Sequence, residues 1–146
     1  MTSRIAWAAL ALMGVGVVLS QSGSWADEEG TSDSLRALVH INFADTGRQG
    51  QGMKNIARIL EADPQAQVVV VCHSGGINAV EAARTEHAQA ITSLIGQGVQ
   101  FVACENTMKR NGITKDDLVP GVGTVPSGAV EVVRRQQFDG FAYFRP

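Results

Sequence analysis

Hydrophobic positions are grouped into short runs between residue 35 and the end of the chain. The clearest run is Gln67–His73, where four consecutive valines show no alternation with polar residues, a pattern typical of a strand that is buried on both faces. Similar β-rich runs predict strands at Leu35–Asn42, Val99–Cys104 and Phe141–Phe144. The glycine-rich segment Leu118–Val125 can hold only a short strand.

Between these runs, apolar residues recur at the spacing of amphipathic helices. This spacing predicts a first helix from Met53 to Leu60, ended by Asp63 and Pro64, and a second helix around Ala88–Ile95. A short helix is expected at Asn106–Arg110, and a last helix from Ser127, the expected N-cap, to about Gln137. Strands that alternate with helices in this way indicate an α/β domain with a parallel sheet covered on both faces.

One glycine-rich segment follows the first predicted strand. Residues 43–52 contain three glycines and read as a turn-forming stretch. The part from Gly47 to Gly52 has some likeness to a loop that cradles an anion, but it lacks the lysine and the spacing of a P-loop. We therefore interpret it as a mobile loop.

The N-terminal residues are typical of a signal peptide. Arg4 precedes an uncharged apolar run, Ile5–Leu19, and the small residues Ser24 and Ala26 favour cleavage after Ala26. A retained membrane anchor is the alternative, although the run is shorter than the ~20 residues of a spanning helix. We predict a signal peptide at 1–26, a flexible leader at 27–34, a domain at 35–146 and a periplasmic or secreted location.

The composition after this cleavage limits the function. Of the 146 residues 120 remain, enough for one domain, and they carry 11 basic and 14 acidic residues because Arg4 is removed. No basic run exceeds two residues, so we expect no nucleic-acid partner. We also expect no membrane partner once the signal peptide is cleaved. Two cysteines are too few for a disulfide-built scaffold.

Candidate chemistry lies just after the predicted strands, because open parallel sheets bind ligands beyond the carboxyl ends of their strands. Both cysteines, Cys72 and Cys104, fall in this set. The polar and glycine positions that we name as candidate binding residues there are Asn42, His73, Ser74, Gly75, Asn106 and Thr107. No spacing of cysteine and histidine matches a zinc signature, so we expect no metal and no cofactor.

The two cysteines have different sequence surroundings. Cys104 precedes a predicted helix, whose amide groups and dipole would lower the pKa of its thiol, whereas the adjacent Glu105 opposes this. The alternative for Cys104 is a small packed side chain. Cys72 follows four valines and reads as the end of a buried strand. His73 is either a base beside a thiolate or a side chain that satisfies a backbone group.

Four segments resemble the DsrE/DsrF-like family: Phe101–Met108, Asp117–Val122, Val125–Gly128 and Gln136–Pro146. The resemblance covers about residues 35–146. It implies a three-layer α/β/α domain with a mostly parallel five-stranded sheet, assembled as a homotrimer or homohexamer. Some members of the family carry sulfane sulfur as a persulfide on one cysteine, and that cysteine matches Cys104.

These observations lead to one functional prediction and two alternatives. The prediction is an exported sulfur-handling protein with Cys104 as the persulfide carrier, a carrier more than an enzyme, with unknown sulfur donor and acceptor. The first alternative is a non-catalytic oligomeric module that binds a small ligand or a protein, with a structural cysteine. The second is a disulfide between Cys72 and Cys104, whose predicted strands follow one another in the chain.

Overall fold

The valine-rich strand predicted around residue 70 lies at the centre of a five-stranded sheet. The computed structural model describes residues 34–146, so the predicted signal peptide and nearly all of the predicted leader lie outside the described residues. The sheet has the order β4-β3-β2-β1-β5, and every pair of neighbours is parallel. Its strands are β1 (Arg36–Ile41), β2 (Gln67–Cys72), β3 (Gln100–Cys104), β4 (Gly123–Val125) and β5 (Ala142–Phe144).

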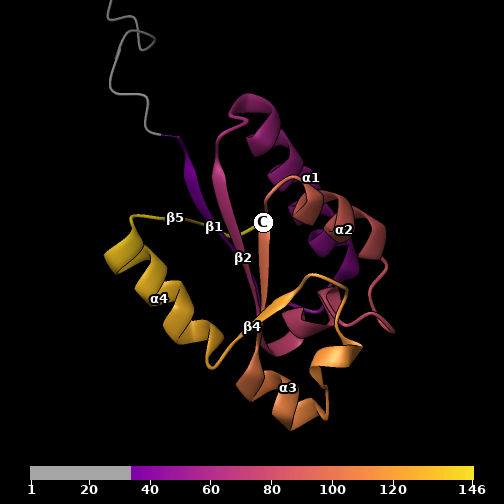
Figure 1. The fold of residues 1–146 in the computed structure, drawn as a ribbon. Coiled ribbons are helices and arrows are strands. Elements are labelled where there is room, and N and C mark those ends of the chain that lie inside the picture. Colours follow the sequence, from indigo (N-terminus) through magenta and orange to yellow (C-terminus); the bar gives the residue numbers. More distant parts are fainter. Residues whose placement is uncertain (1–33) are drawn as a thin grey trace, which may run out of the picture. The chain divides into compact units, whose positions relative to one another are not determined.

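Helices cover both faces of this sheet, which confirms the predicted fold class. The α-helices are α1 (Thr46–Ala62), α2 (Ala88–Gly96), α3 (Glu105–Asn111) and α4 (Gly128–Asp139). Figure 1 shows α1 and α2 on one side of the sheet and α4 on the other. Short 3₁₀ helices lie at Ser74–Ala79 and Lys115–Asp117. No helix within residues 34–146 has the length and apolar character needed to cross a membrane.

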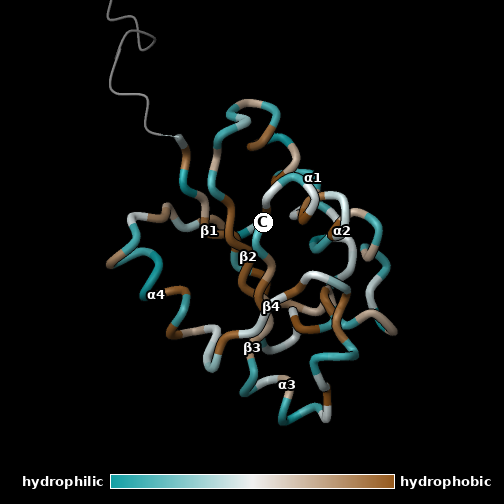
Figure 2. Tube along the Cα trace, in the orientation of Figure 1, coloured by the Kyte–Doolittle hydropathy of each residue, from teal (hydrophilic) through white to brown (hydrophobic). Residues whose placement is uncertain are grey.

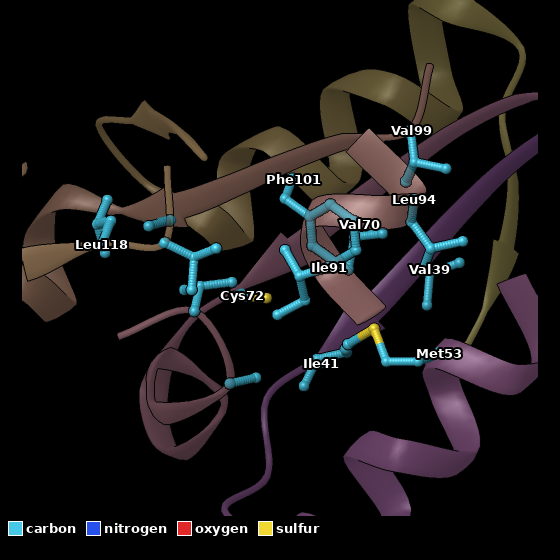
Figure 3. Packing of buried hydrophobic residues seen from close by; sticks show 14 of the residues in the cluster. Val39, Ile41, Met53, Val70, Cys72, Ile91, Leu94, Val99, Phe101 and Leu118 are labelled. Carbon is cyan, nitrogen blue, oxygen red and sulfur yellow. The ribbon is translucent and has the colours of Figure 1, made fainter. Parts of the chain in front are cut away.

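The larger part of the core lies between the sheet and helices α1 and α2. Alternate residues of the central strands point into it, among them Val39, Val70 and Phe101, and they meet Met53 of α1 and Ile91 of α2 (Figure 3). In Figure 2 the central strands form the most hydrophobic part of the trace. Burial of this apolar surface stabilises the fold at about 25 cal/mol per Å².

A smaller cluster lies on the opposite face, beneath α4. It consists of Leu38, Val69, Val71, Val132 and Phe141. Because successive strand residues point to opposite faces, Leu38 and Val69 face α4 while their neighbours Val39 and Val70 face α1 and α2. The near-complete burial of β2 on both faces confirms the interpretation of its valine run.

The interpretation of the segment 47–52 as a mobile loop is wrong. These residues form the first turns of α1, which begins after Asp45, whose carboxylate accepts a hydrogen bond from the backbone N–H of Arg48 at 2.7 Å. Tight packing explains two of the glycines. A Cβ on Gly50 would lie 3.0 Å from the ring of His87, and one on Gly52 would lie 3.1 Å from Pro146.

A 3₁₀ helix follows the end of β2 directly and runs from Ser74 to Ala79. Gly76 lies against the backbone of Ile41, where a Cβ would overlap the carbonyl group. The glycine therefore lets the chain turn close to the end of β1, which positions His73 and Ser74 at the carboxyl edge of the sheet.

Candidate functional site

The two cysteines lie on opposite faces of the sheet. Cys72 pairs in register with Ala103, so Cys104 is one residue further along β3 and its side chain points to the other face. Cys72 is completely buried in the larger core cluster (Figure 3). Both thiols are free, and the predicted alternative of a Cys72–Cys104 disulfide is wrong for this chain. Their side chains point apart, which a disulfide does not tolerate.

Cys104 lines a hollow at the carboxyl edge of the sheet, on the side of α4. The hollow has a volume of about 550 Å³ and lies where β2, β3, α3 and α4 meet. Its lining residues are His73, Ser74, Cys104, Asn106, Thr107, Lys109, Arg110, Ser127 and Ala129. Only 5% of the Cys104 residue is exposed, and it lines this hollow.

The surroundings of the Cys104 sulfur favour the thiolate. Burial by itself raises the pKa of this thiol, but hydrogen bonds to the sulfur outweigh it and the net pKa is lowered. The donors are the backbone N–H of Gly128, the hydroxyl and N–H of Thr107, and the N–H of Asn106. Donors that converge on a sulfur stabilise its charged form.

Two contacts keep these donors in place. Gly128 begins α4 and packs against His73, where a Cβ would lie 3.0 Å from the Cβ of that histidine. The N–H of Asn106 is shared between the Cys104 sulfur and the carbonyl oxygen of Pro126, which lies 3.3 Å from the nitrogen, and this ties the start of α3 to the segment that precedes α4. The Glu105 carboxylate does not line the hollow and accepts a hydrogen bond from the Thr124 hydroxyl at 2.6 Å. Among the described residues, two cationic side chains and no carboxylate line the hollow.

His73 and Ser74 form a second polar group at the hollow. His73 Nδ1 and the Ser74 hydroxyl are 2.9 Å apart, and the Ser74 backbone N–H donates to the Thr107 hydroxyl oxygen at 3.1 Å. Ser74 has φ of 51°, in the left-handed region that favours glycine. Its N–H thus meets the same Thr107 hydroxyl that hydrogen-bonds the Cys104 sulfur.

The hydrogen bonds continue from His73 across the sheet. His73 Nε2 lies 2.6 Å from Nε2 of His40 in β1, and His40 Nδ1 lies 2.8 Å from the hydroxyl of Tyr143 in β5. Burial, with smaller contributions from the neighbouring His73 and Arg145, lowers the pKa of His40 to about 4. Burial and Arg110 also lower the pKa of His73. Both imidazoles are therefore neutral at pH 7.

The structure brings most of the predicted site residues together. His73, Ser74, Cys104, Asn106 and Thr107 all line the hollow. Two others lie elsewhere: the Asn42 side chain accepts hydrogen bonds from Arg145 at 2.9 and 3.2 Å, and Gly75 packs against Phe43 and Ala44. No three His, Cys, Asp or Glu side chains within residues 34–146 are arranged to hold a metal ion.

Sequence analysis did not identify His40, Tyr143 or Gly128. His40 was read as part of a strand, and its alternation with buried Val39 and Ile41 is the signal that would have placed it on the face of His73. Tyr143 gave no such signal, because its position beside β1 depends on the strand order. The importance of Gly128 is recognised only from the structure, where the start of α4 packs against the ring of His73.

Comparisons with known proteins agree with this architecture. The chain is similar to the structure of MTH1491, a protein of unknown function from Methanobacterium thermoautotrophicum, with 35% identity, a TM-score of 0.73 and coverage of 77% of this chain and 100% of that one. It also shares its fold with the ychN protein from E. coli, at 15% identity and a TM-score of 0.65, with coverage of 77% of this chain and 99% of that one. No match was found among curated proteins. The model of the DsrE/DsrF-like family matches residues 36–145, and this chain belongs to that family.

Proposed function

We propose that the protein carries sulfane sulfur as a persulfide on Cys104. The observation that supports this most directly is the set of hydrogen-bond donors around the sulfur, which lowers the pKa of the thiol despite its burial. A thiolate is the nucleophile in reactions at cysteine, so a lowered pKa increases the reactive fraction at neutral pH. Membership of the DsrE/DsrF-like family suggests a sulfur-related role and is consistent with the proposal.

The charge of the hollow favours an anionic sulfur donor. Lys109 and Arg110 line it together with neutral polar side chains. Charged groups of one sign in a concave site raise the local concentration of ligands of the opposite sign. The fitting substrates are small persulfide or polysulfide anions, or a persulfide on the exposed end of a partner protein.

The transfer step balances without an oxidant. The Cys104 thiolate attacks the outer sulfur of a donor persulfide, R–S–SH, and a new S–S bond forms while the S–S bond of the donor breaks. The electron pair of the broken bond leaves on the donor as R–S⁻. Cys104 then carries the sulfur as a persulfide, and the reverse of this step passes it to an acceptor thiol.

Mass spectrometry of the intact protein tests this proposal. We expect incubation with a low-molecular-weight persulfide to increase the mass by one sulfur atom, and a thiol reductant to reverse the increase. Peptide mapping should place the sulfur on Cys104. A protein that gains no sulfur from any such donor would favour the alternative, a non-catalytic module that binds a ligand or a protein at the same hollow.

We also propose that the protein is a homo-oligomer that uses the outer face of α4. Val130, Val133 and Phe138 are 64%, 58% and 72% exposed, and they form a continuous apolar surface with Ala129. Such a surface on a small domain is typical of a protein interface. Ala129 also lines the hollow of Cys104, so a second copy seated here would lie beside the thiol. Light scattering should give more than one chain per particle, and Phe138→Glu should lower that number.

The proposed location is outside the cytoplasm. It depends on the sequence features Arg4, Ile5–Leu19, Ser24 and Ala26 described above. N-terminal sequencing of protein recovered from an export-competent host should begin at Asp27. Recovery of membrane-bound protein that begins at Met1 would contradict the proposal.

A further inference from the structure

Four polar side chains form a hydrogen-bonded row on the α4 face of the sheet. Tyr143 pairs in register with Leu38, which lies two residues before His40 on the same face, and His40 pairs with Val71, two residues before His73. Each residue is therefore one strand further along, from the edge strand β5 through β1 to the end of β2. Ser74 completes the row inside the hollow that Cys104 lines.

Every link in this row is within hydrogen-bond distance. The oxygen of Tyr143 is 2.8 Å from His40 Nδ1, the two Nε2 atoms of the histidines are 2.6 Å apart, and His73 Nδ1 is 2.9 Å from the Ser74 oxygen. The ring centroids of the two histidines are 4.8 Å apart with an angle of 26° between their planes, so the rings lie nearly coplanar and edge to edge, as a hydrogen bond between the two Nε2 atoms requires. The two outer hydrogen bonds hold the rings in this arrangement.

The neutral row has two complete hydrogen-bond arrangements. In the first, Tyr143 donates to Nδ1 of His40, Nε2–H of His40 donates to Nε2 of His73, and Nδ1–H of His73 donates to Ser74. In the second, every donor and acceptor is exchanged, so that Ser74 donates to His73 and the last proton lies between His40 and Tyr143. A neutral imidazole has one donor and one acceptor nitrogen, which is why both arrangements satisfy every atom. One proton hop along each link, together with loss of the Ser74 hydroxyl proton and uptake of one proton by Tyr143, converts the first arrangement into the second.

The two ends of the row meet different environments. Tyr143 is 45% exposed and exchanges protons with solvent, whereas His40 is only 9% exposed. Ser74 lies in the hollow beside Cys104, and Thr107 contacts both Ser74 and the sulfur. The lowered pKa values of both histidines keep the row neutral at pH 7, as its two arrangements require. Arg145 and Arg110 are the charged groups that act on His40 and His73.

We propose that the hydrogen-bonded row from Tyr143 to Ser74 relays a proton to the sulfur that leaves when Cys104 is loaded. This inference rests on the proposed persulfide function. As the S–S bond of the donor breaks, the leaving R–S⁻ takes the hydroxyl proton of Ser74. His73 returns a proton to Ser74, His40 returns one to His73, and Tyr143 returns one to His40. Solvent water then reprotonates Tyr143, so one proton is taken up and no electron enters or leaves.

A series of donors with different leaving thiols tests the relay. The probes are small aryl and alkyl persulfides, and rapid-quench mass spectrometry measures the rate at which Cys104 gains one sulfur atom. A leaving thiolate of high basicity needs a proton, whereas a weakly basic aryl thiolate leaves without one. General acid catalysis by the row should therefore matter most for the basic alkyl thiols.

The variants are Tyr143→Phe and His40→Gln, with His87→Gln as the matched control. His87 contacts the Thr46 carbonyl oxygen at 2.9 Å and does not line the hollow. We expect the first two variants to load sulfur from alkyl donors slower by on the order of a hundredfold, and from aryl donors at nearly the rate of the unaltered protein. The control should match the unaltered protein with every donor.

The outcomes separate the relay from the proposed function. If Cys104 is loaded but both variants keep the unaltered rates, or slow all donors equally, the relay is wrong and the persulfide function stands. If Cys104 gains no sulfur in the unaltered protein, the proposed function itself fails. Tyr143→Phe removes one hydroxyl oxygen from a residue that is 45% exposed and keeps the ring, so far-UV circular dichroism should show an unchanged fold. The rates of this variant therefore remain interpretable even if His40→Gln unfolds.

Discussion

Cys72 and Cys104 end neighbouring strands of one sheet, yet their thiols have opposite properties. The register pairs Cys72 with Ala103, so the two side chains point to opposite faces. Cys72 is enclosed by the larger core cluster, where burial raises the pKa of its thiol to about 12. Cys104 faces α4 and the hollow, where hydrogen bonds lower its pKa in spite of burial. Reactivity here depends on which face a residue occupies, since both positions lie at strand ends.

The largest expected difference is in thiol reactivity. The pKa of Cys72 is about 12 and that of Cys104 is below its ordinary value, so at pH 8 their thiolate fractions should differ by at least about a thousandfold. Iodoacetamide labelling of Cys72→Ser and Cys104→Ser, measured from pH 6 to 10, compares the remaining thiols. Because the pKa of Cys104 is lowered, its labelling should persist to lower pH than that of a free cysteine.

A labelling rate for Cys72 in the native protein close to that of Cys104 would contradict this comparison. The control is the same measurement in denaturant, where both thiols are exposed to solvent and should react at similar rates. If the two thiols still label at different rates in denaturant, the difference is caused by their neighbours in the sequence and not by the fold.

Replacing Cys104 should abolish loading. In Cys104→Ser the hydroxyl forms no S–S bond, so we expect sulfur incorporation to fall to background. The free energy of unfolding should change little, because the hydroxyl meets the same donors from Gly128, Thr107 and Asn106. Mass spectrometry after incubation with a persulfide checks the first expectation, and urea unfolding checks the second. Residual sulfur on this variant would assign the carrier role to Cys72.

Replacing Cys72 should lower the stability of the protein and leave sulfur loading intact. Cys72→Ser places a hydroxyl among apolar side chains, and we expect the free energy of unfolding to fall by about 1–3 kcal/mol. Loading on Cys104 should remain. Cys72→Ala is the matched control, because it removes the sulfur without adding a polar group. If Cys72→Ser loses no more stability than Cys72→Ala, the side chain at position 72 is not buried in a dry environment.

The smallest expected effect concerns Gly128, a buried residue at the start of α4. In Gly128→Ala the new Cβ would lie 3.0 Å from the side chain of His73, so the start of α4 or the ring must shift. A displaced N–H donates less well to the Cys104 sulfur, and we expect the pKa of that thiol to rise.

The matched control for this substitution is Gly96→Ala. Gly96 ends α2, and a Cβ there would meet nothing within 4 Å. The pH dependence of iodoacetamide labelling should therefore match that of the unaltered protein in Gly96→Ala and shift upward in Gly128→Ala. An unchanged profile in both variants would show that the N–H of Gly128 contributes nothing to the thiolate.

Local pattern was sufficient to predict most of the secondary structure. The valine run of β2 has no polar alternation, so a strand buried on both faces was the direct interpretation, and the sheet confirms it. The start of α1 was missed because Gly47, Gly50 and Gly52 favour turns in isolation. The contacts of Gly50 and Gly52 in the fold come from residues far along the chain, His87 and Pro146, which no local pattern contains.

The candidate site shows the same limit. Cys104, Asn106 and Thr107 are close in sequence, and His73 follows a recognisable strand, so their common edge of the sheet could be predicted. The neighbours of His73 could not. Contact between His40 and Tyr143 requires β5 to lie beside β1, and the strand order is a property of the whole chain.

Ser74 has a conformation that glycine would adopt at lower energy. Its φ of 51° costs a residue with a side chain on the order of 1–2 kcal/mol. Glycine at this position would relieve that strain and would also remove the hydroxyl that His73 contacts. A search for thermally stabilised variants should therefore select glycine here, and the same variant should be a poorer sulfur carrier. Stability and activity make opposing demands on this one side chain.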